Sequence, residues 1–162
     1  MATERVSTAN EFKGNYIIYY ALVAGQVLIA LVISFLMMGN EITFGWDMSN
    51  PFHLIAPILM LSSISMSSFL FTKKMEEAKN IKGLFSKLAH YRSAIILRSA
   101  VIEGVNLACI IFYFLEQNYF FLLLFFIGLG VFLLVRPSEE FFREKYRLTE
   151  EERIKFRKMV NK

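Results

Sequence analysis

The chain has 162 residues, of which 56% are hydrophobic, and its mean hydropathy is +0.46. This apolar fraction exceeds the roughly 45–50% that is usual in soluble domains, and one soluble core of this size could not bury it. The composition therefore predicts an integral membrane protein. The single cysteine, Cys109, excludes an internal disulfide. The net charge of +4 says less than the placement of the charges along the chain.

Four apolar runs follow one another along the chain, and each is close to the about 20 residues with which a helix crosses a bilayer. Isolated strands would leave backbone groups unpaired in lipid, so helices are predicted. The predicted fold class is an all-α integral membrane four-helix bundle. Its expected spans are residues 16–38, 51–71, 94–115 and 119–135.

The basic residues are distributed unevenly between the connections. The segment 39–50 contains Glu41 and Asp47 but no Lys or Arg, whereas 72–93 and the tail 136–162 are rich in both. Basic connections stay on the cytoplasmic side of a membrane. We therefore expect a multi-pass protein of the cell inner (plasma) membrane with both termini in the cytoplasm.

Further features refine this topology. The N-terminal segment 1–15 is polar, and the first apolar run is too long for a cleaved signal peptide, so it is predicted to stay as an anchor. The third connection is predicted to be a tight turn at Gln117–Asn118 on the outer side. Aromatic residues such as Tyr19 and Trp46 lie at the predicted membrane edges, where they are typical interface anchors. The 72–93 segment mixes charged and apolar residues, which predicts that its flanking helices extend into the cytoplasm.

The tail 136–162 is predicted to be helical, amphipathic and cytoplasmic. Pro137 ends the fourth span, Ser138 can cap a new helix, and Thr149 with Glu152 has the form of a capping box. Two apolar patches are expected, one from Phe141, Phe142 and Tyr146 and one from Phe156, Met159 and Val160. They could lie on anionic lipid headgroups or dock a cytoplasmic partner.

The two halves of the chain resemble each other in sequence. When the segment from Ala21 is set over the segment from Ala100, Gly25 falls on Gly104 and Leu28 on Leu107. This alignment predicts a tandem duplication of a helical hairpin. Chance similarity between apolar helices, which share a small alphabet of residues, is the alternative explanation.

Glu103 is the main candidate functional residue. It lies nine residues inside the third predicted span, roughly 14 Å deep at about 1.5 Å per residue. A charge at that depth costs at least about 2.5–3.5 kcal/mol, so such residues face the protein interior or a cavity and mark ion or proton paths. Glu103 is therefore predicted to bind a proton or a monovalent cation.

Polar residues at a similar depth could complete this site. Oxygen-bearing side chains of this kind suit a hard cation or a shared proton. The candidates are Gln26, Asn106, Ser62 and Ser63. The alternative is a structural cluster whose interhelical hydrogen bonds hold the helices together at roughly 0.6 kcal/mol each.

Other chemistry is not indicated by the sequence. The two histidines, His53 and His90, lie far apart without a partnering cysteine, so neither a metal site nor a cofactor is predicted. No nucleophile–base pair is recognisable, and the protein is predicted not to be an enzyme. The basic tail lacks a recognisable nucleic-acid-binding fold, so no nucleic acid is expected as a partner. Arg98 is expected to extend towards the inner interface.

The segment RSAVIEGVNLACIIFYFL, residues 98–115, resembles the ion-carrying helix of rotary ATPase proteolipid subunits. That family has a mid-membrane glutamate in an A-x-x-E setting after a basic cytoplasmic loop. The resemblance implies that Glu103 carries the ion and that Gln26 is an accessory ligand. The preceding helix departs from the pattern, because it is rich in serine and methionine where the family has glycine. As a whole, the chain is similar to small four-helix proteins of bacterial inner membranes.

Of the three function classes that the sequence leaves open, an enzyme is the least supported, and the other two are favoured. One is the handling of protons or monovalent cations through Glu103. The other is a non-catalytic membrane subunit or scaffold that docks a cytoplasmic or membrane protein partner through the basic 72–93 loop and the tail. Besides the lipid bilayer, a homo-oligomer is an expected partner, because helix faces with small residues suit packing between subunits.

Overall fold

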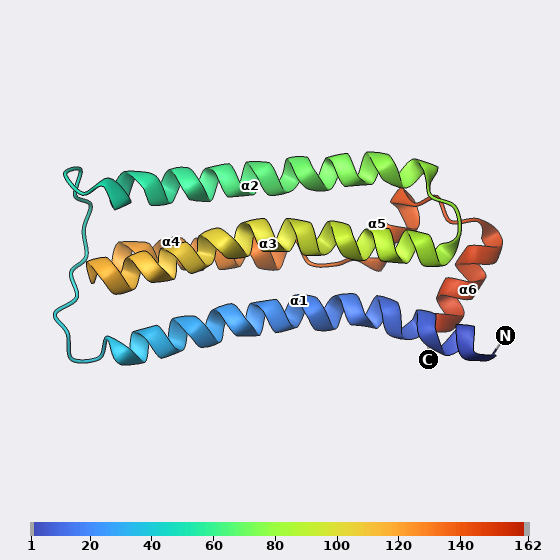
Figure 1. The fold of residues 1–162 in the computed structure, drawn as a ribbon, viewed down its shortest axis with the longest axis horizontal. Coiled ribbons are helices and arrows are strands. Elements are labelled where there is room, and N and C mark those ends of the chain that lie inside the picture. Colours follow the sequence, from blue (N-terminus) through green and yellow to red (C-terminus); the bar gives the residue numbers. More distant parts are fainter. Residues whose placement is uncertain (1, 161–162) are drawn as a thin grey trace.

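The computed structural model describes the backbone of residues 2–160 and the side chains of residues 14–157, and no β-strand occurs in this part of the chain. The four long helices run lengthwise beside one another, and the short helices α5 and α6 lie at one end (Figure 1). The elements are α1 (Ala2–Leu36), α2 (Pro51–Glu77), the 3-10 helix η1 (Ala78–Asn80), α3 (Leu84–Glu116), α4 (Tyr119–Leu134), α5 (Glu139–Lys145) and α6 (Glu150–Val160).

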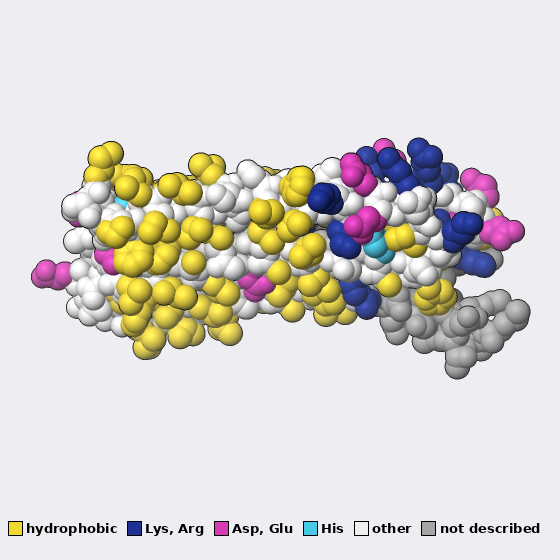
Figure 2. Space-filling view, turned by 45° about the horizontal axis from the view of Figure 1, so that its top comes forward, with side chains coloured by type: hydrophobic (Ala, Val, Ile, Leu, Met, Phe, Trp, Pro, Cys, Tyr) yellow, Lys and Arg dark blue, Asp and Glu magenta, His cyan; other side chains and the backbone are white. Residues whose placement is uncertain are grey.

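Several of these helices could cross a membrane. Three segments, residues 14–36, 51–80 and 84–116, are long and apolar enough, and α4 with α5 makes a fourth if the pair counts as one span bent by 58°. Helix α4 alone has 16 residues, about 24 Å of helix against a bilayer core of about 30 Å. Large apolar side chains cover much of the surface of the long helices (Figure 2). These features indicate a multi-pass helical membrane protein.

The helix ends follow the local signals in the sequence. Asn50 caps α2, with its side-chain oxygen accepting from the backbone N–H of Phe52, and Pro51 follows at the first helical position. Gln117 ends α3 in the left-handed conformation at φ 49°, and Asn118 caps α4. The tight turn predicted at Gln117–Asn118 is confirmed.

At the end of the bundle that holds this turn, which we call the loop end, the 37–50 connection is fastened to the turn. The backbone N–H of Thr43 donates to the carbonyl of Gln117 at 2.9 Å, and that of Tyr119 donates to the carbonyl of Thr43 at 3.0 Å. The Asn118 side chain donates to the carbonyl of Gly45 at 3.0 Å. This loop-end clamp joins the first helix pair to the second.

His53 lies beneath the clamp and is only 2% exposed. Its ring packs against the rings of Trp46, Phe120 and Phe121 at centroid distances of 4.9–5.9 Å. Its Nε2 lies 3.2 Å from the Asn118 amide nitrogen. His53 is therefore part of the packed structure that supports the clamp.

Helix α3 is the central element, because it packs against α1, α2 and α4. Helix α1 is joined to α4 by Tyr19, whose hydroxyl donates to the carbonyl of Phe132 at 2.6 Å and whose ring stacks on that residue. Tyr19 is 1% exposed. The expectation that it anchors the protein in the interface is therefore wrong, since a paired and buried hydroxyl does not face headgroups.

The other end of the bundle, which we call the basic end, carries the helix extensions that the 72–93 segment predicts. Helix α2 continues to Glu77, and α3 begins at Leu84. The tail folds back onto this extended surface instead of leaving its apolar side free. The shared core contains Leu88 and Tyr91 of α3 together with the tail residues Phe142, Tyr146, Leu148 and Phe156.

A buried ion pair fastens α6 to α3. The Nζ of Lys87 lies 2.7 Å from a carboxylate oxygen of Glu152, and the two side chains are 8% and 14% exposed. Glu152 also accepts from the backbone N–H of Thr149 at 3.0 Å, while its own N–H donates to the Thr149 hydroxyl, so the predicted capping box is confirmed. The side chains of Met159 and Val160, predicted to extend the apolar side of α6, lie outside the described residues.

We expect Lys87→Met to loosen the tail strongly, because it leaves the largely buried Glu152 carboxylate without its cationic partner, at a cost of about 3 kcal/mol. Lys74→Met is the matched control, since Lys74 and its partner Glu77 are 32% and 58% exposed, and it should cost less than about 1 kcal/mol. The rate of protease cleavage after residue 147 measures both. Equal cleavage rates in the two variants would contradict a structural role for the Lys87–Glu152 pair.

The same pair predicts an acid-sensitive tail. Burial raises the pKa of Glu152, but hydrogen bonds from Lys87 and from Thr149 outweigh it and leave the pKa below the usual 4.5. A carboxyl whose pKa is lowered in the folded state stabilises the fold at any pH above its pKa in the unfolded chain. That stabilisation is lost as the pH falls through the pKa of the folded state. Cleavage of the tail by an acid-active protease should therefore accelerate below about pH 4.5. The Glu152→Gln variant should not show this acceleration. If cleavage of the variant still accelerates at low pH, other carboxyls cause the acid sensitivity.

Candidate functional site

Two of the predicted site residues form a buried pair in the middle of the helices. The side-chain nitrogen Nδ2 of Asn106 on α3 donates to the Oε1 of Gln26 on α1 at 2.7 Å. Both residues are 0% exposed. An amide pair of this kind satisfies polar groups where no water is available and fixes the relative heights of α1 and α3.

Gly128 on α4 completes the packing around the pair. A Cβ atom at this position would lie 1.9 Å from the Asn106 Oδ1 and 2.7 Å from the terminal carbon of Met60. Only glycine therefore allows α4 to approach the Asn106 side chain this closely. Three helices, α1, α3 and α4, meet at this point, which we call the amide cluster (Gln26, Asn106 and Gly128).

The amide cluster is not fully satisfied. The Gln26 Nε2 and the Asn106 Oδ1 are buried and have no hydrogen-bond partner. Each amide thus uses one of its two polar groups in the bond between them. A donor and an acceptor are left over inside the protein, and such groups usually mark strain, a functional role or a bound small species.

Glu103 does not belong to the amide cluster. It lies one turn before Asn106 on α3 and is partly exposed. No hydrogen bond or ion pair joins it to another residue in the part of the chain that the structure describes. Glu103 is therefore an unpaired carboxyl halfway along an apolar helix, whereas its polar neighbours are held by one another.

The structure does not bring the predicted serines to this carboxyl. Ser62 is exposed on α2, whereas Ser63 is buried and its hydroxyl donates to the carbonyl of Met60 at 2.9 Å. A serine that bonds the carbonyl of its own helix satisfies itself and needs no other helix. Of the five predicted site residues, only Gln26 and Asn106 are in hydrogen-bond contact. No group of three or more His, Cys, Asp and Glu residues suited to a metal occurs among the described residues.

Comparison with models of known protein families, with curated protein sequences and with solved structures finds no match. The function must therefore be argued from the chain's own residues.

Sequence reasoning missed two features around this site. Gly128 gave no signal, because a glycine in an apolar helix is common and its necessity depends on which side chain faces it. The cavity beside Arg98 at the basic end was missed as well, because it is formed by the break after α4. The buried state of Asn106 was signalled by its mid-helix position, since an amide in lipid needs a partner.

We expect Gly128→Ala to destabilise the protein by about 1–3 kcal/mol, because the added methyl group overlaps the buried Asn106 amide. Gly130→Ala on the same helix is the matched control, since a Cβ there meets nothing within 4 Å. Thermal unfolding in detergent measures both variants. If the two melt alike, the close approach of α4 to Asn106 is not a constraint on the fold.

Proposed function

We propose that this chain is a small multi-pass membrane protein that handles protons through Glu103. The proposal includes four membrane spans in the inner membrane, with both termini and the basic end on the cytoplasmic side. The observation that supports it best is the isolation of Glu103. If the residue were a structural lock it would have a partner, and the locking bond in this part of the protein joins Gln26 to Asn106 instead.

The energetics favour a role for this carboxyl that depends on its titration. A charged carboxylate at this depth costs at least about 2.5–3.5 kcal/mol, and no cationic side chain among the described residues pairs with Glu103 to offset that cost. A protonated carboxyl avoids the charge and can lose its proton when a carrier, water or another subunit reaches it. Partial exposure on the side of α3 gives such access.

A proton suits this arrangement better than a monovalent cation. A dehydrated cation needs several oxygen ligands around it, and the predicted ligands are engaged elsewhere or face outward. Ser62 is exposed, and the Ser63 hydroxyl is bonded to Met60. The free Asn106 Oδ1 is one oxygen and cannot make a cation site by itself. Sodium binding nevertheless remains a measurable alternative for this site.

A homo-oligomer would give Glu103 a protein environment. Ala100 and Gly104, which flank it on α3, are both exposed, and a Cβ at Gly104 would meet nothing within 4 Å. Small residues in such positions allow the backbone of a second helix to approach closely. We propose that this face of α3 meets another subunit, which would cover the carboxyl and control its access to protons.

We expect Glu103 to react with a hydrophobic carbodiimide, which modifies protonated carboxyls that are accessible from lipid. Labelling should fall as the pH rises through the pKa of the group, and Glu103→Gln should abolish it. Glu116→Gln is the matched control, because Glu116 lies at the loop end, where it accepts a hydrogen bond from Asn50. Peptide mass spectrometry locates the label. No labelling of residue 103 at any pH would contradict a titrating, accessible carboxyl.

Two further measurements separate the alternatives for this site. If sodium protects Glu103 from the carbodiimide, the species bound at this site is a monovalent cation and not a proton. Proton flux into proteoliposomes under an imposed potential should occur with the native chain and fall at least tenfold in Glu103→Gln. Flux that is equal in the native chain and this variant would overturn the proton-handling proposal.

A second candidate function is a non-catalytic subunit or scaffold, and one observation favours it. Basic side chains gather at the basic end (Figure 2), and Lys79, Lys82, Lys145 and Arg147 there are exposed. Because Phe142 is buried within the chain's own core, a partner would meet mainly the charged surface. Loss of partner binding in Lys79→Glu with Lys82→Glu, without loss in Glu103→Gln, would favour this function.

A further inference from the structure

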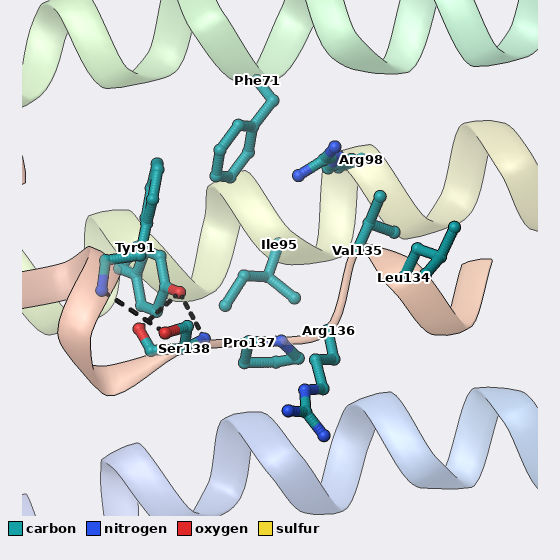
Figure 3. A pocket seen from close by; sticks show the side chains of 10 residues that line it. Phe71, Tyr91, Ile95, Arg98, Leu134, Val135, Arg136, Pro137 and Ser138 are labelled. Atoms are coloured by element: carbon teal, nitrogen blue, oxygen red, sulfur yellow. Dashed lines mark hydrogen bonds between the residues drawn. The ribbon is translucent and has the colours of Figure 1, made fainter. Parts of the chain in front are cut away.

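A cavity of about 200 Å³ lies at the basic end, where α4 stops and α5 turns away from it. It is much larger than the about 10–15 Å³ that one water molecule requires. Phe71 of α2 and Ile95 and Arg98 of α3 form one side, and Val135 and Pro137 form the other (Figure 3). The walls are therefore mostly apolar, with a guanidinium group at one edge.

The break between α4 and α5 creates this cavity. Pro137 has no backbone N–H to continue a helix, and the chain bends by 58° between the two helices. The bend is held by Tyr91, whose hydroxyl accepts from the backbone N–H of Ser138 and donates to its carbonyl, each at 3.1 Å (Figure 3). The cavity is thus supported by hydrogen bonds on its floor and is not a loose gap between helices.

Arg98 is the polar group that this cavity leaves incomplete. Its guanidinium lies over the ring of Phe71, 4.6 Å from the ring centroid, which fixes its position. Its Nε is buried and has no hydrogen-bond acceptor. Among the described residues no carboxylate pairs with Arg98, and no Asp or Glu lines the cavity. Arg98 is only partly exposed, and a partly buried guanidinium is stabilised by hydrogen bonds to an anion, so an anionic acceptor would complete the site.

The depth of Arg98 indicates where the acceptor comes from. Arg98 lies four residues inside the apolar run that begins at Ala94, which corresponds to about 6 Å of helix. From this depth the long Arg98 side chain can reach the headgroup level of the leaflet that borders the basic end. Basic pockets between transmembrane helices on the cytoplasmic side bind the headgroups of anionic lipids. A soluble anion would gain nothing from the apolar walls formed by Phe71 and Ile95.

We propose that this cavity binds the phosphate group of an anionic phospholipid. The Arg98 guanidinium donates to the phosphate oxygens, and the apolar walls hold the adjoining part of the lipid. Arg136 lies at the rim and is exposed; its side chain extends towards α1 and away from Arg98 (Figure 3). Arg136 therefore adds positive potential at the entrance, and the direct contact belongs to Arg98. This site is independent of the proposed role of Glu103.

Native mass spectrometry of the full chain in detergent tests the proposal. After delipidation, the protein is given phosphatidylglycerol or phosphatidylcholine in equal amounts. The native chain should bind one phosphatidylglycerol in preference to phosphatidylcholine, and Arg98→Gln should weaken that binding about tenfold, the usual effect of losing a hydrogen bond to a charged group. Lys82→Gln, which removes an exposed charge outside the cavity, is the control and should leave binding unchanged.

A second variant tests the cavity while the charge is retained. Val135→Phe places a larger side chain in the cavity beside Arg98, and it should reduce phosphatidylglycerol binding while the helix content measured by circular dichroism stays the same. Equal binding of the two lipids by the native chain, or an equal loss in Lys82→Gln and Arg98→Gln, would overturn the site. Displacement of the lipid by millimolar inorganic phosphate would assign the cavity to a free anion and overturn the lipid as its source.

Discussion

The hydrogen bond between Asn106 and Gln26 is the constraint on which the arrangement of the helices depends. In an apolar surrounding, a buried amide costs several kcal/mol unless it is paired, so α1 and α3 can adopt only heights at which these two side chains meet at 2.7 Å. The Asn106 amide then excludes any side chain at residue 128, which fixes the approach of α4. Apolar contacts alone would permit many registers, because one leucine packs much like another.

The need to pair buried polar groups also explains the contacts at both ends of the protein. At the loop end, backbone groups of Thr43 are paired with the turn at Gln117 and Tyr119. At the basic end, the Tyr91 hydroxyl holds Ser138, and Lys87 holds Glu152. Against this background of paired groups, Glu103 and Arg98 differ from the rest. They are the acidic and the basic side chain within the four apolar runs, and neither has an ion-pair partner among the described residues. This makes them the best candidates for contacts with something outside the chain.

Much of the helical organisation could be predicted from the sequence because its signals are local. Pro51 and Pro137 stop or start helices through their missing N–H, and Thr149 with Glu152 forms a cap within four residues. The docking of the tail could not be predicted, because the apolar side of Phe142 and Tyr146 fits a lipid surface and a protein surface equally well. The assembled surface around Leu88 and Tyr91 decides between them. The candidate site around Glu103 was predictable only in part. The sequence gives the depth of Glu103 along its helix, but the packing of the helices decides the direction in which its side chain faces.

The loop-end clamp has a consequence for the order in which the protein matures. Thr43 is far from Gln117 and Tyr119 in the sequence, and the hydrogen bonds between them cannot form until the chain has been synthesised as far as Tyr119. Until then the 37–50 segment has no partner for these backbone groups except water, and His53 has no Phe120 or Phe121 to cover it. Closure of the clamp therefore requires α3 and the start of α4 to be in place, and a chain shortened before Tyr119 would lack the bond from Tyr119 to Thr43.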